Sequence, residues 1–259
     1  MGAPKMTVSR TAGADVLVIV PARNEAANID DVIADLRAHA GPCDILVVDD
    51  HSTDDTAARA RSLGVHVVRL PYNLGIGGAV QTGFRYARRM GYRHALQFDG
   101  DGQHAADQID ELLTPLRSGL ADVAIGSRFL AAGGFRGTGM RRVGMRMFQW
   151  LSRATSGIRI TDTTSGFRAY RAPAIRFLVD RYPSDYPEVE SITHLARAGF
   201  RIVEVPARMR ERQAGTSSIG LKRTVYYLVK VSLASVVSAG RPRKPRRDEQ
   251  ARADARKRA

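Results

Sequence analysis

Short apolar runs alternate with amphipathic stretches along the first half of the chain, and this alternation limits the fold more than any other feature. The apolar runs predict buried strands at 15–20, 44–48, 65–70, a run ending at Phe98, and 122–125. Helices are expected between them: one capped by Asn24, one ending near Leu63, then 75–90 and 106–116. Such short intervals predict an α/β fold with a mostly parallel sheet flanked by helices. Ligands of these sheets bind at the carboxyl ends of the strands.

The second half of the chain has a less regular pattern. Strands are expected at 164–170 and 200–205, and helices at 172–179 and 188–198. A polar stretch over 210–219 reads as a loop, and 221–239 as an amphipathic, mostly apolar helix. No apolar stretch reaches the length of a transmembrane helix.

Two aspartates one residue apart follow the fourth apolar run. Because side chains alternate along a strand, Asp99 and Asp101 are expected to point to one side, with Gly100 and Gly102 permitting tight turns. Oxygen ligands on a loop suit Mg²⁺ or Mn²⁺, with open positions left for substrate phosphates. The alternative for an isolated Asp-X-Asp is a solvated acidic turn that closes a strand.

Charge is concentrated at the end of the chain. The net charge is +14, and residues 240–259 hold nine basic and three acidic residues with almost no apolar side chains. This composition predicts a disordered basic tail, suited to nucleic acid or to an anionic membrane surface. The single cysteine, Cys43, excludes an internal disulfide and favours a reducing cytosol.

Six short motifs occur in an order and spacing that resemble a known family. They are Val20–Glu25, Val47–Asp54, Asn73–Ala79, Asp99–His104, Gly126–Phe129 and Thr164–Tyr170. Together they resemble the family-2 glycosyltransferases with a GT-A fold, closest to the polyprenyl-phosphate (dolichol-phosphate-mannose-synthase-like) group. The resemblance covers roughly 15–220 and implies a flexible N-terminus at 1–14. It divides the domain into a nucleotide-sugar half, 15–126, and an acceptor half, 127–220.

The resemblance assigns the donor site to residues in the first half. The implied nucleotide-sugar ligands are Pro21, Ala22, Arg23, Glu25, Asp49, Asp50, Gly78, Asp99 and Gly100. Asp99 and Asp101, with Gln103, are the implied ligands of Mg²⁺ or Mn²⁺, with Asp101 also catalytic. The cation would act as a Lewis acid on the leaving diphosphate. For His104 we expect a structural or capping role, with a metal ligand or a group behind one as the alternative. For Asp54 we expect a helix N-cap, with a contact to substrate as the alternative.

The resemblance places an acceptor phosphate among residues of the second half. They are Arg128, which is also a catalytic candidate, Arg141, Ser165, Arg168, Arg212 and Ser217. Guanidinium groups match phosphate oxygens in fork geometry. For Arg141 and Arg142 the alternative is a position facing water. Arg212 and Ser217 belong to a loop implied to close over the donor diphosphate.

The acidic run Asp185–Glu190 departs from the family pattern. Glu190 falls on the family's glutamate, whereas Glu188 stands where a glutamine is frequent. Both are catalytic candidates, since Asp185 or Glu188 would suit a general base for a hydroxyl acceptor. A helix start that favours acids is the alternative. The frequent C-terminal transmembrane pair is missing, and 221–259 would instead lie on a membrane or bind a partner membrane protein.

The resemblance therefore implies an inverting, metal-dependent glycosyltransferase. It would transfer a sugar from a nucleotide diphosphate sugar to a polyprenyl phosphate or lipid-linked glycan in cell-envelope assembly. The expected location is cytoplasmic, peripheral on the inner face of the membrane. Transfer to a glycan hydroxyl, with an acid from 185–190 as base, is the alternative. A nucleotidyltransferase is disfavoured because Pro21–Glu25 is no glycine- and lysine-bearing loop. No aromatic-interleaved basic module indicates specific nucleic-acid binding.

Overall fold

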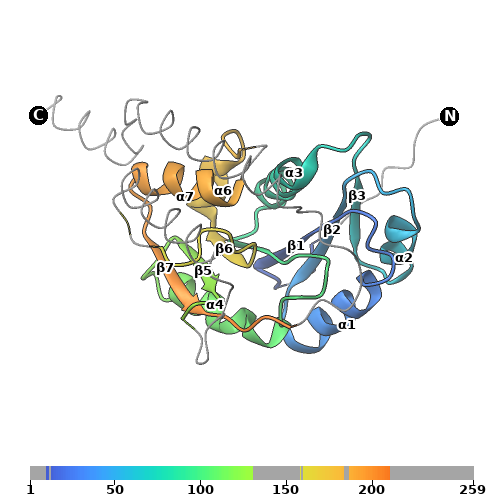
Figure 1. Ribbon diagram of the computed structural model, residues 1–259, viewed down its shortest axis with the longest axis horizontal. Helices are drawn as coiled ribbons and strands as arrows, with labels where there is room; N and C mark the ends of the chain where they lie inside the picture. Colours follow the sequence, from blue (N-terminus) through green and yellow to red (C-terminus); the bar gives the residue numbers. More distant parts are fainter. Residues whose placement is uncertain (1–9, 12, 131–157, 159, 184–186, 211–259) are drawn as a thin grey trace, which may run out of the picture.

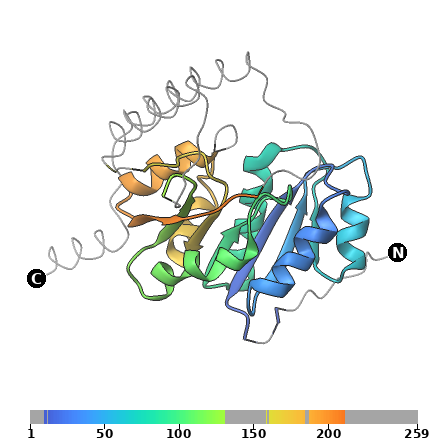
Figure 2. The same ribbon diagram turned by 60° about the horizontal axis from the view of Figure 1, so that its bottom comes forward.

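The computed structural model describes residues 10–11, 13–130, 158, 160–183 and 187–210. Within these residues the chain forms one seven-stranded sheet in the order β3-β2-β1-β4-β6-β5-β7. Figure 1 shows the sheet between two groups of helices, and Figure 2 shows the same layers from below.

All strands of the sheet run in the same direction except one. Their bounds are β1 Val16–Ala22, β2 Asp44–Asp49, β3 His66–Arg69, β4 His94–Gln97, β5 Val123–Ser127, β6 Arg168–Arg171 and β7 Ile202–Pro206. Strands β1 to β4 pair in parallel, as do β5 and β7. Strand β6 is antiparallel to both β4 and β5. The expected mostly parallel sheet is confirmed, with β6 as the exception.

The helices cover both faces of the sheet. They are α1 Ile29–His39, α2 Thr56–Ser62, α3 Gly75–Met90, the short 3₁₀ helix η1 Ala106–Gln108, α4 Ile109–Arg117, α6 Ala172–Leu178 and α7 Pro187–Arg197. Helices α1, α2 and α4 contribute to one apolar cluster, and α3, α6 and α7 to the other. Figure 1 shows the second group above the sheet. No described helix is long and apolar enough to cross a membrane.

Strand β1 shows why the sheet is buried on both faces. Val16, Val18 and Val20 belong to the cluster under α1 and α4, whereas Leu17 and Ile19 belong to the cluster under α3. Adjacent side chains of a strand point to opposite faces, so a continuous apolar run serves two cores at once. Strand β1 therefore lies in the middle of the sheet, and its carboxyl end reaches the site.

Three local predictions need correction. Helix α1 starts at Ile29 with Asn28 at the N-cap, not Asn24, whose backbone has a φ of 55° and whose side chain accepts a hydrogen bond from Thr53. The N-cap of α2 is Asp55, although Asp54 accepts hydrogen bonds from the backbone amides of Thr56 and Ala26. The expected strand 164–170 begins only at Arg168, because the residues before it turn into the site.

Candidate active site

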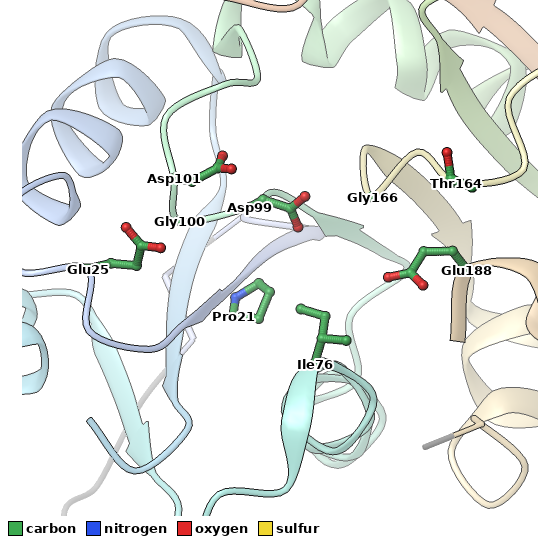
Figure 3. Close-up of a pocket in the computed structure, with 9 residues that line it drawn as sticks. All are labelled: Pro21, Glu25, Ile76, Asp99, Gly100, Asp101, Thr164, Gly166 and Glu188. Carbon is green, nitrogen blue, oxygen red and sulfur yellow. The ribbon is translucent and has the colours of Figure 1, made fainter. Parts of the chain in front are cut away.

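A cleft opens where β1 and β4 end, and it collects residues from both halves of the domain. It has a volume of about 200 Å³ and is lined by Pro21, Glu25, Ile76, Asp99, Gly100, Asp101, Thr164, Gly166 and Glu188. Figure 3 shows Asp99 and Asp101 on one side of it and Glu188 on the opposite side. The expectation that polar residues meet at the carboxyl ends of the strands is met for this group.

The loop after β4 carries the two aspartates into the cleft. Gly100 lies so close to the end of β1 that a Cβ at this position would be 3.2 Å from the carbonyl oxygen of Pro21. Oδ1 of Asp101 accepts a hydrogen bond from the backbone amide of Gln103 at 3.1 Å. This bond fixes the turn of the loop and leaves the carboxylate of Asp101 at the lining of the cleft.

Asp99 is held by three neighbours. Nε2 of His104 lies 3.1 Å from Oδ2 of Asp99, and Nε2 of Gln97 donates to Oδ1 at 3.3 Å. The His104 ring is buried and stacks on Phe167, with ring centroids 5.1 Å apart. Burial opposes ionisation of Asp99, but the hydrogen bonds from His104 and Gln97 and the electrostatic attraction of His104 and Arg168 outweigh it and lower the pKa of Asp99. Asp99 is therefore a carboxylate with a fixed orientation.

Gly166 is the third neighbour of Asp99. A Cβ at Gly166 would lie 2.4 Å from Oδ2 of Asp99, so only glycine permits this approach. The loop before β6 thus packs directly against the acidic loop after β4. His104 caps none of the described helices; it is buried and orients Asp99.

The residues present suit a hard divalent cation. Asp99 and Asp101 line the same cleft, and the side chain of Asp99 is 33% exposed. Carboxylate oxygens, with the amide oxygen of Gln103 on the same loop, are the ligand type that Mg²⁺ and Mn²⁺ prefer. Among the described residues no group of three histidine, cysteine, aspartate or glutamate side chains converges. A cation held here would complete its shell with substrate oxygens and water.

The Pro21–Glu25 segment forms one wall of the cleft. Pro21 and Glu25 line it, Ala22 is buried at the end of β1, and Arg23 is exposed. The segment is anchored because the backbone amide of Glu25 donates to the hydroxyl of Thr56. The carboxylate of Glu25 accepts a hydrogen bond from the side chain of Asn28 at 2.7 Å.

Asp49 and Asp50, expected to hold the nucleoside, are both buried and bonded within the protein. Asp49 accepts from the amide of Ser52 and lies 3.2 Å from Nε of Arg69. Asp50 accepts from the amide of Leu74 at 2.6 Å. Neither lines the cleft, so in this structure they shape the loops around it. Gly78 permits close packing of the first turn of α3, since a Cβ there would lie 2.3 Å from Cβ of Leu74.

Arg128 is held at the edge of the cleft by a buried carboxylate. Its Nε and Nη2 donate to the two carboxylate oxygens of Asp162, both at 2.6 Å. Nη2 also donates to the hydroxyl of Thr164, a residue of the cleft lining, at 2.8 Å. Asp162 is fixed in turn, because its amide donates to Glu204 of β7. This chain of contacts presents a planar cation beside the cleft.

Arg168 and Ser165 are not placed as phosphate ligands, and this prediction is corrected. Arg168 is 1% exposed, and its guanidinium donates to the carbonyl oxygens of Thr163, Ser165 and Glu188. Ser165 is also buried, and its hydroxyl accepts from the amide of Phe167. Arg168 therefore ties the loop that holds Thr164 and Gly166 to the start of α7. Its guanidinium makes these hydrogen bonds inside the protein and does not face the cleft.

Glu188 faces the cleft from the first turn of α7. Burial is the largest influence on its carboxyl group and raises its pKa, while the charge of Arg168 opposes this and that of Asp99 adds to it. Asp99 and Glu188 thus face one cleft with pKa values shifted in opposite directions. Glu190, two residues further along α7, does not line the cleft.

Other predicted residues lie outside the described part of the chain. These are Arg141, Arg142, Asp185, Arg212, Ser217, the helix 221–239 and the tail 240–259. The sequence interpretation missed Ile76, Thr164 and Gly166 as cleft residues, although all three belong to motifs that it used. It also missed Asp162, which holds Arg128 and lies in no motif.

Comparison with known proteins identifies the family of this chain. A sequence model described as glycosyl transferase family 2 matches residues 17–178. An undecaprenyl-phosphate mannosyltransferase of Micrococcus luteus is 36% identical over 216 residues, covering 79% of this chain and 87% of the relative. A polyprenol monophosphomannose synthase of Mycolicibacterium smegmatis is 34% identical over 214 residues, covering 78% of this chain and 80% of the relative.

A solved structure shares the fold. Glucosyl-3-phosphoglycerate synthase of Mycobacterium tuberculosis, in complex with Mn²⁺, UDP and phosphoglyceric acid, aligns with a TM-score of 0.66 at 23% identity. The alignment covers 89% of this chain and 80% of that one. The architecture is therefore of the GT-A type. The chain belongs to glycosyltransferase family 2.

Proposed function

We propose that this glycosyltransferase is an inverting, cation-dependent enzyme that transfers a sugar, mannose first among the candidates, to the phosphate of a polyprenyl phosphate. The choice of acceptor and sugar rests on the two relatives, since both are named for polyprenyl-phosphate or polyprenol mannosylation. The observation that carries the chemistry is the cleft itself. It holds two carboxylates on the donor side and the anchored guanidinium of Arg128 on its edge.

The donor would occupy the side formed by the ends of β1 and β4. Pro21 and Glu25 would contact the nucleoside, and Asp99 and Asp101 the region of the diphosphate. Asp99, Asp101 and Gln103 would hold Mg²⁺ or Mn²⁺, which supplies Lewis-acid stabilisation of the leaving diphosphate when bound. The protein's own contribution is to keep Asp99 ionised and aimed, through His104 and Gln97, before the donor arrives.

The acceptor would enter from the side of Arg128, Thr164 and Glu188. Arg128 is oriented by Asp162, and its guanidinium would attract the acceptor phosphate and set the angle of attack. The phosphate oxygen then forms a bond to the anomeric carbon as the bond to the diphosphate breaks, with inversion of configuration. A phosphate acceptor is already ionised, so this step needs no strong base.

A peripheral position on the inner face of the cell membrane fits this acceptor. A polyprenyl chain stays in the bilayer, so the cleft must meet its phosphate at the membrane surface. The basic tail at 240–259 would supply attraction to anionic lipids. A partner membrane protein is the alternative anchor.

One observation favours a second candidate function, transfer to a hydroxyl of a lipid-linked glycan. Glu188 lines the cleft, and its pKa is raised, as the environment of a general base requires. In this case Glu188 would take the proton of the attacking hydroxyl. The lipid-phosphate acceptor is preferred because it also uses Arg128.

The test is sugar transfer by the purified full chain. The assay would combine GDP-mannose and a panel of other GDP- and UDP-sugars with Mn²⁺ or Mg²⁺ and two acceptors, a short-chain polyprenyl phosphate and a lipid-linked sugar. We expect a mannosyl lipid phosphate of inverted anomeric configuration, seen by mass spectrometry and NMR. Transfer only to the sugar hydroxyl would favour the second candidate, and transfer that survives EDTA would remove the cation from the proposal.

A further inference from the structure

The loop that carries Asp101 and Gln103 is also held from outside the cleft, by a segment that follows β7. The backbone amide of Arg210 donates to the carbonyl oxygen of Gln103 at 2.9 Å. His104 and Met209 form an isolated antiparallel bridge beside it. The chain therefore returns from β7 to lie along the far edge of the acidic loop.

Asp35 of α1 joins this segment to the end of the same loop. Its Oδ2 accepts from the backbone amide of Ala106 at 3.1 Å and from Nη1 of Arg210 at 2.9 Å, while Oδ1 accepts from Nη2 of Arg210 at 3.3 Å. Nδ1 of His39 lies 3.0 Å from Oδ1 of Asp35. One carboxylate thus joins helix α1, the acidic loop and the segment after β7.

The position of this carboxylate distinguishes it from an ordinary surface ion pair. An exposed pair between two helices contributes little and is screened by salt. The side chain of Asp35 is only 15% exposed, and it also accepts a backbone hydrogen bond that ends the Asp101–Ala106 loop. Removing either partner would release the outer end of the loop, whereas His104 and Gln97 hold only its inner end at Asp99.

We propose that Asp35 and Arg210 are positioning residues for the cation- and diphosphate-binding loop. They form a clamp, defined here as Asp35, Arg210 and their bonds to Gln103 and Ala106, that holds Asp101 and Gln103 in place before the donor binds. Neither residue lines the cleft. Groups behind metal ligands orient them and affect affinity strongly, even without touching the ion. This inference rests on the proposed cation role of Asp101 and Gln103.

The chain provides a matched control on the same helix. Asp30, in the first turn of α1, pairs with Arg59 of α2, whose Nη2 lies 2.5 Å from Oδ2 and whose Nε donates to both carboxylate oxygens at 3.1 and 3.2 Å. Arg59 meets this carboxylate through Nε and Nη2, whereas Arg210 meets Asp35 through Nη1 and Nη2, and the Asp30 pair does not include the acidic loop. Asp30→Asn therefore removes a two-point ion pair from α1 and leaves the clamp intact.

The first measurement tests the clamp without any cation. Amide hydrogen exchange at Ala106 in the ligand-free protein would be compared in the wild type and in Asp35→Asn, Arg210→Gln and Asp30→Asn. We expect about tenfold faster exchange in the two clamp variants and no change in Asp30→Asn. Asp35→Asn replaces the charged acceptor of the Ala106 amide with a neutral one, and Arg210→Gln removes the cation that orients this acceptor. Unchanged exchange in both clamp variants would overturn the proposal.

The second measurement tests the consequence for the cation. Mn²⁺ would be titrated into each variant at saturating GDP, and separately UDP, with free Mn²⁺ followed by electron paramagnetic resonance. We expect about tenfold weaker Mn²⁺ binding in Asp35→Asn and Arg210→Gln, in the range for groups behind a metal ligand, with wild-type binding in Asp30→Asn. Faster exchange with unchanged Mn²⁺ binding, or equal weakening in all three variants, would overturn the positioning role. Absence of Mn²⁺ binding to the wild type would instead remove the cation claim itself, and the clamp's positioning role with it.

Discussion

The carboxyl groups on the two sides of the cleft have pKa values shifted in opposite directions. On the donor side, Asp99 keeps a low pKa because His104 and Gln97 donate hydrogen bonds to it despite its burial. On the acceptor side, Glu188 has a raised pKa because burial outweighs the attraction of Arg168. A site that holds a cation and a diphosphate needs a fixed charge, whereas a side that meets an anionic phosphate gains from having fewer negative charges. The difference is consistent with the proposed assignment of the donor to the wall of Asp99 and of the acceptor to the wall of Glu188.

The two halves also differ in how they fix their loops. In the donor half, side-chain carboxylates such as Asp50 and Asp101 accept from backbone amides. In the acceptor half, the carboxylate of Glu204 likewise accepts from backbone amides, but arginine side chains add connections, with Arg128 bound to Asp162 and Arg168 bound to three carbonyl oxygens. Replacement of single groups on each side therefore separates donor from acceptor effects.

The largest effect is expected for Asp101→Asn. Asparagine keeps an oxygen that can accept from the amide of Gln103, so the loop should keep its turn while one anionic ligand is lost. A Lewis acid contributes several kcal/mol to such a step, so we expect kcat to fall by about a thousandfold. Steady-state transfer assays with a Mn²⁺ titration measure this. Wild-type turnover with unchanged Mn²⁺ dependence would contradict the donor-side assignment.

Two glycines provide the next test, which separates geometry from stability. In Gly166→Ala the new Cβ would displace the carboxylate of Asp99, and a misplacement of about 1 Å can cost about a hundredfold in rate. In Gly83→Ala the Cβ would lie 2.4 Å from Ile19 in the core, so overpacking should cost about 1–3 kcal/mol of unfolding free energy instead.

Thermal denaturation and turnover per folded molecule, measured on both glycine variants, distinguish the two effects. Gly166→Ala should lose turnover with little change in Tm, and Gly83→Ala should show the reverse. Equal loss of turnover in both would mean that Asp99 does not need the position that this structure gives it.

A smaller effect is expected for Arg128→Lys, which keeps the charge and removes the fork. Lysine cannot bond both oxygens of Asp162 and also reach Thr164 in the same way, so the cation at the edge of the cleft loses its orientation. We expect kcat/KM for polyprenyl phosphate to fall about tenfold or more, consistent with loss of charge-assisted bonds, while KM for the donor stays unchanged.

The control for Arg128→Lys is Arg171→Lys. Arg171 of β6 pairs with Asp122 at 3.4 Å and does not line the cleft. A higher donor KM in Arg128→Lys, or an equal loss in both variants, would contradict the acceptor-side assignment.

The smallest effect on activity is expected for Glu188→Gln. A general base contributes about 10²–10⁴-fold, so a change under about tenfold in transfer to polyprenyl phosphate excludes that role. A loss of a hundredfold or more would favour the hydroxyl acceptor.

Glu188 also makes a prediction about stability and pH. Its folded-state pKa is raised above the ordinary value of 4.5, so the folded protein binds more protons than the unfolded chain across that interval. The unfolding free energy should therefore decrease as pH rises through the pKa of Glu188, and Glu188→Gln should lack this decrease. Chemical denaturation of both proteins from pH 4 to pH 8 measures it, and parallel profiles would contradict the raised pKa.

Much of the fold could be predicted from the sequence because β1, β2 and β4 are central strands whose two faces are both apolar. The apolar pattern of these strands and the turn at Asp99–Gly102 both depend on residues that are neighbours in the sequence. The direction of β6 could not be predicted, because it depends on pairing between β4 and β5 rather than on any feature of Arg168–Arg171.

The roles of Arg128 and Arg168 could not be predicted from the sequence either. Arg128 and Arg168 both lie in short motifs, but contacts distant in sequence decide which one is accessible to a ligand. Arg128 meets Asp162 at the edge of the cleft, whereas Arg168 is enclosed by carbonyl oxygens that include that of Glu188. A charged residue type indicates possible chemistry, and burial decides whether it is available to a ligand.

The most direct test of the account is a crystal structure of the full chain with Mn²⁺ and GDP, with data collected at a wavelength where manganese scatters anomalously. The account predicts an anomalous peak at the carboxylate of Asp101 and next to the diphosphate, with the nucleoside on the side of Pro21 and Glu25 and with Glu188 across the cleft. Nucleotide bound elsewhere, or bound in the cleft with manganese away from Asp101, would contradict it.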